Sequence, residues 1–243
     1  MKLKVLGCGD AFASEGRFNT SFLLLGNTQK ILVDCGGSTL IRLKQEGYTA
    51  EDIDQIIITH FHGDHYGGLP FLVISNHFEH QRSKPLTIWG PEGIKEKAHA
   101  LQEALYPGTG PLLDELPISF KEFIADAWLG AEDIRVFSKT VIHSPPSNPH
   151  GIKLEFEDKV FGFSGDSEWT DNLRPLAEDT DLFVCECNFL DKDGPGHISY
   201  HTLIEKTQLL KTQRLMINHM GSAVIHANDL KIDRMKDGME VDF

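Results

Sequence analysis

Short apolar runs recur along the chain and end at a glycine, a histidine or an acidic residue, a pattern that predicts buried strands. Longer segments between them have helical periodicity, and Ser38 and Ser199 stand where N-caps are expected. The alternation of both patterns predicts an α/β fold. The predicted strands are residues 2–6, 21–25, 31–33, 56–58, 86–89, 140–143, 151–156, 160–164, 182–185 and 215–219, and the predicted helices are 39–46, 92–105 and 200–210.

The length and the apolar content suit a sizeable core, since the chain has 243 residues of which 40% are hydrophobic. We expect a single domain over residues 1–243. No apolar run approaches the roughly 20 residues that span a bilayer, and the N-terminus enters a strand pattern at once, unlike a signal peptide. The four cysteines (Cys8, Cys35, Cys185 and Cys187) are scattered in or beside apolar strands. They are typical of reduced thiols, so we expect a cytoplasmic protein without membrane contact.

The charge is strongly one-sided, with 23 basic and 36 acidic residues and a net charge of −13. Such a surface repels polyanions, which disfavours a long nucleic acid as the partner. A small anionic substrate remains compatible with the sequence if bound cations reverse the sign of the charge locally.

Four potential metal ligands directly follow the predicted strand at 56–58. A strand that continued into this cluster would direct His60 and His62 to the same side. Asp64 and His65 come next, in a predicted turn. Neutral imidazoles with one or two carboxylates suit zinc, or manganese and iron as substitutes. The alternative is a histidine-rich surface turn without metal, and it is disfavoured because this array has almost no packing rationale.

Three further ligand residues end later apolar runs, namely His143, Asp166 and His219. Each is a weak signal alone: a single histidine at a strand end is more often structural, and Asp166 lies in a Ser-Gly-Asp-Ser stretch that suits a turn. Strand ends gathered at one rim of a sheet sandwich are where loop-borne active sites lie. We therefore expect these residues to meet the first cluster.

The clustered ligands resemble the metal-binding signature of the metallo-β-lactamase superfamily, and the similarity runs from Gly7 to His219, nearly the whole chain. The resemblance implies a four-layer αββα sandwich and a dinuclear hydrolase that holds two divalent cations, zinc in the first place, with a metal-bridging hydroxide as the nucleophile. Carried over residue by residue, it implies one cation held by His60, His62 and His143, a second held by Asp64, His65 and His219, and Asp166 bridging both.

Three details are similar to the phosphodiesterase branch of the superfamily, which includes ribonuclease Z and the phosphoribosyl cyclic phosphodiesterase. The opening Gly-Cys-Gly at residues 7–9 has Arg17, Asn19 and Ser21 downstream, as that branch does. The Ser-Gly-Asp-Ser around Asp166 is close to its Ser-Gly-Asp-Thr. Residues 196–199, Gly-His-Ile-Ser, resemble its Gly-His-Ser/Thr element, and β-lactamases and thioester hydrolases generally lack that extra histidine.

The extra histidine, His197, then has a chemical role. Cleavage of a phosphodiester expels an alkoxide, and a nearby imidazolium stabilises the developing charge or protonates the leaving oxygen. Glu186, at the end of the preceding strand, is a candidate partner that orients His197. Asp64 is a candidate for steering the nucleophilic water, although metal ligation alone would explain it. The alternatives are that His197 merely belongs to a glycine- and proline-rich loop and that Glu186 is a solvated strand end.

One departure from ribonuclease Z bears on the substrate. In that enzyme the arm that grips transfer RNA is inserted between the third histidine and the bridging aspartate. Here a proline-rich turn and a hairpin are all that separate His143 from Asp166. Transfer RNA is therefore disfavoured, and a small cyclic or linear phosphodiester, nucleotide-derived among the options, fits better. Many relatives are dimers, so the resemblance also implies a homodimer.

Two other functions stay open at this point. A carboxylic ester, lactone or thioester hydrolase would use the same metals on a carbonyl group, and a metal-bound binding domain would have lost turnover. His197 favours the phosphodiesterase, since a carbonyl hydrolase has less need of that acid.

Several residues near the motifs receive no firm role. His77, His80, Arg82 and Lys84 form a basic stretch that we interpret as a solvated loop rather than a phosphate contact. Phe12, Phe18, Tyr66 and Trp169 lie close to motif residues; core packing is expected for most of them, with Tyr66 as the exception that lines a pocket. The remaining histidines, His99, His150, His201 and His226, are unassigned.

Overall fold

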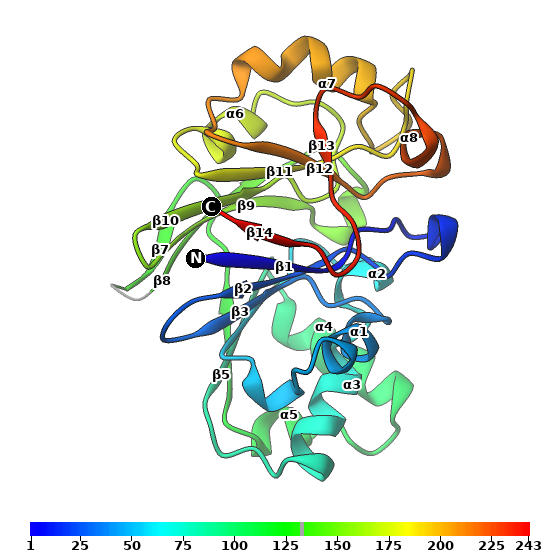
Figure 1. Ribbon diagram of the computed structural model, residues 1–243. Helices are drawn as coiled ribbons and strands as arrows, with labels where there is room; N and C mark the ends of the chain where they lie inside the picture. The colour runs from blue at the N-terminus through cyan, green and yellow to red at the C-terminus, as the bar shows by residue number, and fades with distance from the viewer. Residues whose placement is uncertain (132–133) are drawn as a thin grey trace.

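The computed structural model describes residues 1–131 and 134–243. Two mixed β-sheets pack face to face in the middle of the molecule, and helices cover both outer faces, as Figure 1 shows. This is the four-layer αββα sandwich expected from the sequence. Both ends of the chain lie together, because the first and last strands pair antiparallel. None of the helices in the described ranges is long and apolar enough to cross a membrane. The single-domain organisation over 1–243 stays a prediction.

The first sheet has the strand order β14-β1-β2-β3-β4-β5-β6. Neighbours from β14 to β3 run antiparallel, and those from β3 to β6 run parallel. The bounds are β1 Lys2–Gly7, β2 Ser21–Leu25, β3 Lys30–Val33, β4 Gln55–Ile57, β5 Leu86–Gly90, β6 Ile118–Glu122 and β14 Glu240–Asp242.

The second sheet has the strand order β13-β12-β11-β10-β9-β8-β7. Strands β7 to β10 form an antiparallel meander, and β10 to β13 run parallel. The bounds are β7 Trp128–Ala131, β8 Ile134–Thr140, β9 His150–Phe156, β10 Lys159–Phe163, β11 Leu182–Glu186, β12 Leu215–Asn218 and β13 Asp233–Arg234.

The helices divide between the two outer layers. Most helices of the first half of the chain lie beneath the first sheet in the view of Figure 1, and those of the second half lie above the second sheet. The bounds are α1 Thr39–Gln45, α2 Gly63–Tyr66, α3 Leu69–Ile74, α4 Ile94–Leu105, α5 Leu112–Glu115, α6 Leu173–Ala177, α7 Tyr200–Lys206 and α8 Ser222–His226.

Alternation of side chains along the strands builds two cores from one sheet. In β2, Phe22 and Leu24 belong to the core between the two sheets, whereas Leu23 belongs to the core between the first sheet and its helices. Phe22 packs edge-on against Phe163 of the opposite sheet, with ring centroids 5.2 Å apart. Aromatic pairs at this spacing and angle stabilise the packing beyond the apolar area they bury. The two sheets are therefore fixed relative to each other, and so are the loops at their rim.

The strands that lead to the site end earlier than expected. Strands β4, β8 and β12 stop at Ile57, Thr140 and Asn218, so that the site histidines lie in the loops that follow. The turn expected at Asp64 and His65 is the short helix α2. Ser38 occupies the N-cap position of α1 without a side-chain cap bond, because its hydroxyl contacts Asn19 instead. Ser199 caps α7 as expected, by accepting a hydrogen bond from the Thr202 amide.

The interpretation of Arg82 as part of a solvated basic loop is wrong. Its side chain is buried, and its guanidinium donates to the carbonyl oxygens of Ala50 at 3.2 Å, Ile53 at 2.7 Å and Pro85 at 2.8 Å. A guanidinium presents five donors in a fixed fork, which suits it to gathering several carbonyls at once. Arg82 thus ties the segment before β4 to the segment before β5.

Replacing Arg82 with methionine is expected to lower the free energy of unfolding by about 3 kcal/mol, because buried carbonyl groups lose their donors. The measurement is a urea titration of the variant beside Arg174→Met, whose side chain is 51% exposed in α6. Equal free energies of unfolding for the two variants would contradict a stabilising role of the buried Arg82 hydrogen bonds.

Candidate metal centre and active site

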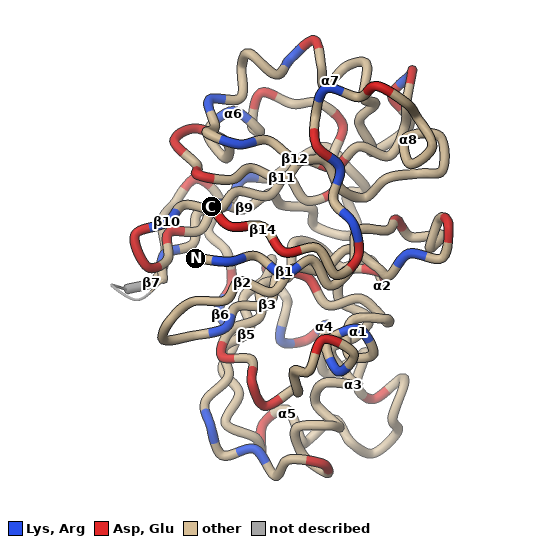
Figure 2. The backbone as a smooth tube through the Cα atoms, viewed as in Figure 1, with Lys and Arg blue, Asp and Glu red and all other residues tan. Residues whose placement is uncertain are grey.

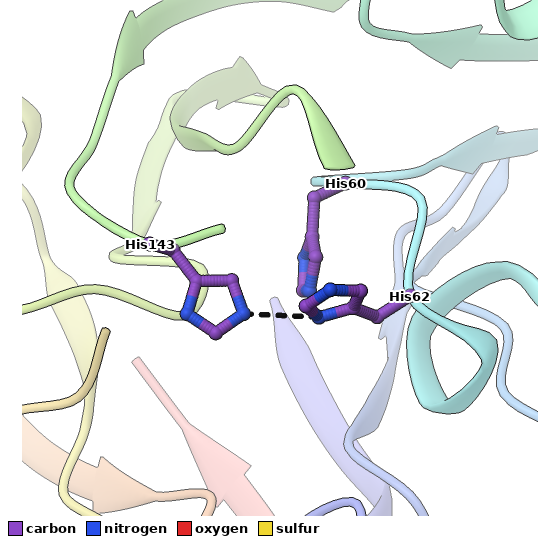
Figure 3. A group of neighbouring side chains, drawn as sticks. All are labelled: His60, His62 and His143. Carbon is purple, nitrogen blue, oxygen red and sulfur yellow. Dashed lines mark hydrogen bonds between the residues drawn. The ribbon is translucent and has the colours of Figure 1, made fainter. Parts of the chain in front are cut away.

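Three histidines form the first group of potential metal ligands. His60 and His62 come from the loop after β4 and His143 from the loop after β8, and Figure 3 shows their rings facing one another. His62 Nδ1 lies 3.0 Å from His143 Nε2, the dashed line in the figure. Two nitrogen ligands of a tetrahedral zinc, each about 2.0–2.1 Å from the ion, lie roughly 3.3 Å apart. The spacing of this pair therefore fits a shared cation.

Hydrogen bonds hold two of these rings by Nδ1, the nitrogen that faces away from the other ligands. His143 Nδ1 donates to the Gly196 carbonyl at 2.8 Å, and His60 Nδ1 lies 3.1 Å from the Thr59 hydroxyl, which itself donates to Asp34. The Nε2 atoms then carry lone pairs, and the buried Nε2 of His60 has no hydrogen-bond partner among the described residues. Such outer contacts are typical of histidines that bind metals.

Burial also sets the protonation of this first group. It lowers the pKa of His60 well below its ordinary value, and it lowers the pKa of His62 and of His143 as well. All three rings are therefore neutral near pH 7. A neutral imidazole is the form that binds a transition metal.

The second group combines two carboxylates with two histidines, Asp64 and His65 of α2, Asp166 after β10 and His219 after β12. His65 Nε2 lies 3.2 Å from an oxygen of each carboxylate. His219 Nε2 lies 3.4 Å from Asp64 Oδ2 and 3.3 Å from Asp166 Oδ2. The four ligand atoms lie within 4.8 Å of one another, so the structure brings together the residues expected around a second cation, whose binding stays a prediction.

Asp166 stands between the two groups. Its Oδ2 is also 3.8 Å from His60 Nε2 and 3.9 Å from His143 Nε2, both of the first group. Its other oxygen, Oδ1, is buried without a hydrogen-bond partner in the described part of the chain. One oxygen, Oδ2, thus lies within 3.9 Å of nitrogens of both ligand groups, which is compatible with the bridging role that the resemblance implies for Asp166; that role stays a prediction.

The second group is charged where the first is neutral. Burial alone would lower the pKa of His65 and of His219, but the neighbouring carboxylates outweigh this effect. They raise the pKa of His65 well above its usual value and that of His219 to about 9. The same histidines hold the pKa of Asp166 well below its usual value against the effect of burial. Divalent cations would displace these protons, so metal affinity is expected to fall as the pH falls.

Sequence reasoning assigned no role to Asp34. Its buried carboxylate accepts from His65 Nδ1 at 2.7 Å and from the Thr59 amide and hydroxyl at 2.8 and 2.9 Å. It fixes the orientation of His65 from behind. Gly36 lets the segment that carries Asp34 approach the segment that carries Asp64 and His65, since a Cβ at position 36 would lie 2.1 Å from the Asp64 carbonyl oxygen. The position of Asp34 directly after the apolar run 31–33 was the available signal.

His197 and Glu186, the two candidates for catalysis, are hydrogen-bonded to each other. His197 Nδ1 lies 2.8 Å from Glu186 Oε1, and the same oxygen accepts from the Ser167 amide at 2.7 Å. Glu186 is fully buried rather than a solvated strand end. The ring of His197 stacks on His219 with centroids 5.3 Å apart. With Nδ1 engaged, Nε2 of His197 has no hydrogen-bond partner in the described ranges, and the ring lies beside His219 of the second ligand group.

The Glu186 carboxylate determines the acidity of His197. Burial alone would lower the pKa of His197, but the hydrogen bond and the charge of Glu186 reverse this and raise it above the ordinary value. His197 is therefore well suited to carry a proton near neutral pH.

A cavity of about 420 Å³ opens onto both ligand groups and His197. Phe12, rather than the expected Tyr66, supplies an aromatic wall. Tyr66 packs against the core between the first sheet and its helices, and Trp169 packs against the hydrophobic cluster that includes Phe22 and Leu24. The unassigned histidines lie elsewhere: His99 beside Asp114, His201 beside Glu205, His226 beside Glu15, and His150 against the Asn148 carbonyl. A larger hollow of about 660 Å³ beside residues 230–239 contains none of the predicted site residues.

The αββα sandwich with this histidine and aspartate cluster at its rim is the architecture of the metallo-β-lactamase class of metal-dependent hydrolases. A family model described as anti-Pycsar protein Apyc1 matches residues 1–234. The chain belongs to this family.

Similar proteins and solved structures also belong to the metallo-β-lactamase class. Ribonuclease Z of Clostridium beijerinckii is 42% identical over 276 residues, which cover 90% of this chain and 88% of the relative. Two solved structures share the fold: the short form of human tRNase Z, with a TM-score of 0.81, 21% identity and coverage of 100% and 99%, and YhfI of Bacillus subtilis, with a TM-score of 0.78, 22% identity and coverage of 99% of each chain. The expected superfamily, its ribonuclease Z-like branch and a metal-dependent hydrolase are thereby confirmed.

Proposed function

We propose that the protein is a dinuclear metal-dependent phosphodiesterase that acts on a small, cyclic or nucleotide-derived phosphodiester. The observation that carries this proposal is the His197–Glu186 pair, 2.8 Å apart, at the edge of the two ligand groups. The buried carboxylate favours a protonated imidazole at this place, and expulsion of an alkoxide calls for an acid.

The two ligand groups support the proposal that the protein binds two divalent cations, zinc in the first place and manganese or iron as substitutes. In this proposal Asp166 would help to hold both cations, and the bound cations would supply an activated water near neutral pH and stabilise the charge of the displacement. The ligands of the first cation are His60, His62 and His143, and those of the second are Asp64, His65 and His219.

The chain's own residues then have separate tasks. The His197 Nε2 proton goes to the leaving oxygen, while Glu186 holds the ring by Nδ1. His143 is oriented by the Gly196 carbonyl, and the Gly196 amide is bound by Glu168 Oε1 at 2.9 Å. The loop that carries His197 is thus anchored beside His143. Asp64 lines the same cavity, and in this proposal it orients the attacking water besides ligating.

A small substrate is supported by the chain between His143 and Asp166. Only a short turn and the β9–β10 hairpin lie there, with no room for an RNA-binding arm. Acidic residues are spread over both halves of the molecule in Figure 2, in keeping with the net charge of −13. Both observations disfavour transfer RNA, although ribonuclease Z is among the relatives. The homodimer and the cytoplasmic location stay predictions from the sequence.

The test is hydrolysis of bis(p-nitrophenyl) phosphate by zinc- and manganese-loaded protein beside a panel of lactones and thioesters. Turnover of the phosphodiester with the ester panel silent is expected. Efficient ester turnover without phosphodiester cleavage would establish a carbonyl hydrolase instead, and absence of all turnover in a protein that binds both metals would point to a binding domain.

A further inference from the structure

The cavity above the ligand groups has a polar floor and an apolar rim. The floor is made by the site histidines and carboxylates, and the rim by Ala11, Phe12, Phe189 and Pro195. Phe12 is 86% exposed and Phe189 is 37% exposed. Leaving two aromatic rings uncovered beside a reactive centre is unfavourable in water, and such rings are typical of binding sites.

The loop that presents Phe12 is held in place by a buried carboxylate. Asp10 accepts from the Phe12 amide at 3.2 Å, and from the Ser14 amide and hydroxyl at 2.9 and 2.7 Å. Asn188 Nδ2 lies 3.5 Å from the same carboxylate, and the Asn188 amide donates to Glu186. The Phe12 loop is therefore connected through Asn188 to the residue that orients His197.

Phe189, the second aromatic residue of the rim, is held in place by its backbone and by Gly194. Its amide donates to the Ile198 carbonyl, and its carbonyl accepts from the Tyr200 amide at 2.8 Å. Gly194 packs so closely on the ring that a Cβ would lie 2.1 Å from Phe189 Cε2. The ring centroid is 6.3 Å from that of His197. A group held against Phe189 is thus adjacent to the proposed acid.

The charges around the cavity limit what else a substrate can carry. Among the described residues that line it there is no lysine or arginine, whereas Asp10, Asp64 and Asp166 are present. Arg17, just after the Phe12 loop, is engaged with Cys8 Sγ and the Met235 carbonyl. A second phosphate would meet no lysine or arginine among the described residues of this cavity, so the apolar rim fits an uncharged part of the substrate.

We propose that Phe12 and Phe189 form an aromatic subsite that binds a flat, uncharged ring attached to the scissile phosphodiester. The proposal rests on the proposed function, since the phosphoryl group must lie at the metal centre for its substituent to reach the rim. Both phenylalanines act on binding; His197 and the ligand residues act on the phosphoryl group. Flat rings stack on aromatic side chains whatever their hydrogen-bonding pattern, so the subsite selects for a planar ring and not for one particular base.

The test compares equilibrium binding of phenylphosphonate and methylphosphonate to the zinc-loaded protein by calorimetry. Both probes offer the same phosphonate group, and they differ in the ring alone. The phenyl compound is expected to bind about tenfold more tightly, and Phe12→Ala is expected to abolish most of that preference while leaving methylphosphonate binding unchanged. Phe78→Ala is the matched control, because Phe78 is 66% exposed and does not line the cavity.

Equal binding of the two phosphonates, or a phenyl preference that persists in Phe12→Ala, would overturn the subsite and leave the proposed function standing. A loaded protein that binds neither phosphonate and cleaves no phosphodiester would overturn both. A loss of preference in Phe78→Ala equal to that in Phe12→Ala would also overturn the subsite, because the effect would not be local to the cavity.

Discussion

Alanine in place of Asp166 is expected to remove bound metal and to lower phosphodiester turnover by a thousandfold or more, on the order of what the loss of a two-metal centre costs. The reason is the position of its carboxylate, within 3.9 Å of the inner nitrogens of His60, His65, His143 and His219. The measurement is metal content per chain by elemental analysis after dialysis, together with the rate. The wild-type protein should retain about two equivalents of zinc, and the variant fewer.

Asp166→Asn is the companion variant, because the amide keeps the shape and removes the charge. Circular dichroism on both variants separates loss of the site from loss of the fold. Retention of two zinc ions per chain in Asp166→Ala would contradict the bridging role.

Alanine in place of His197 is expected to lower kcat for phosphodiester cleavage by about 10²- to 10⁴-fold, the range over which a general acid acts. Metal content is expected to stay at the wild-type value, because His197 is assigned to neither ligand set. The measurement is kcat beside metal content. A variant that loses metal together with activity would show that His197 acts as a ligand, and a variant with unchanged kcat would remove its assigned role.

Glu186→Gln provides the matched control for His197, since the imidazole remains and its buried negative partner is lost. The carboxylate raises the pKa of His197, so its removal lowers that pKa. An acid must be protonated to act, and activity is lost as the pH rises through its pKa. The alkaline limb of the kcat profile is therefore expected to move to lower pH in Glu186→Gln. A limb at the wild-type position would show that Glu186 acts through structure alone.

The parts of the fold that the sequence predicted are those with fully buried, continuous apolar runs. Strands β2, β10 and β11 bury both faces or nearly so, and their positions followed from composition alone. Asp166 follows β10 and Glu186 ends β11, and His60, His143 and His219 likewise follow the apolar runs of β4, β8 and β12. The convergence of His60, His143, Asp166 and His219 could therefore be expected before the structure was known.

The rest of the fold depends on contacts that no local pattern reveals. The edge strand β6 is largely exposed, and β14 is a short strand that exists because it pairs with β1, more than two hundred residues earlier. The charge of Arg82 predicts a surface position, yet its buried guanidinium donates to carbonyl groups of distant segments. Asp34 bonds to His65, 31 positions away. A polar side chain can be buried only where hydrogen-bond partners meet it, and the tertiary fold decides which distant residues those partners are.

The most direct test of the central claim, that His197 supplies the leaving-group proton in phosphodiester cleavage, is the dependence of the rate on the leaving group. Single-turnover rates are measured for aryl methyl phosphodiesters whose phenols span about three pKa units, in the wild-type protein and in His197→Ala. We expect a nearly flat dependence in the wild type and a steep fall with rising phenol pKa in the variant. Parallel slopes in the two proteins would contradict the account.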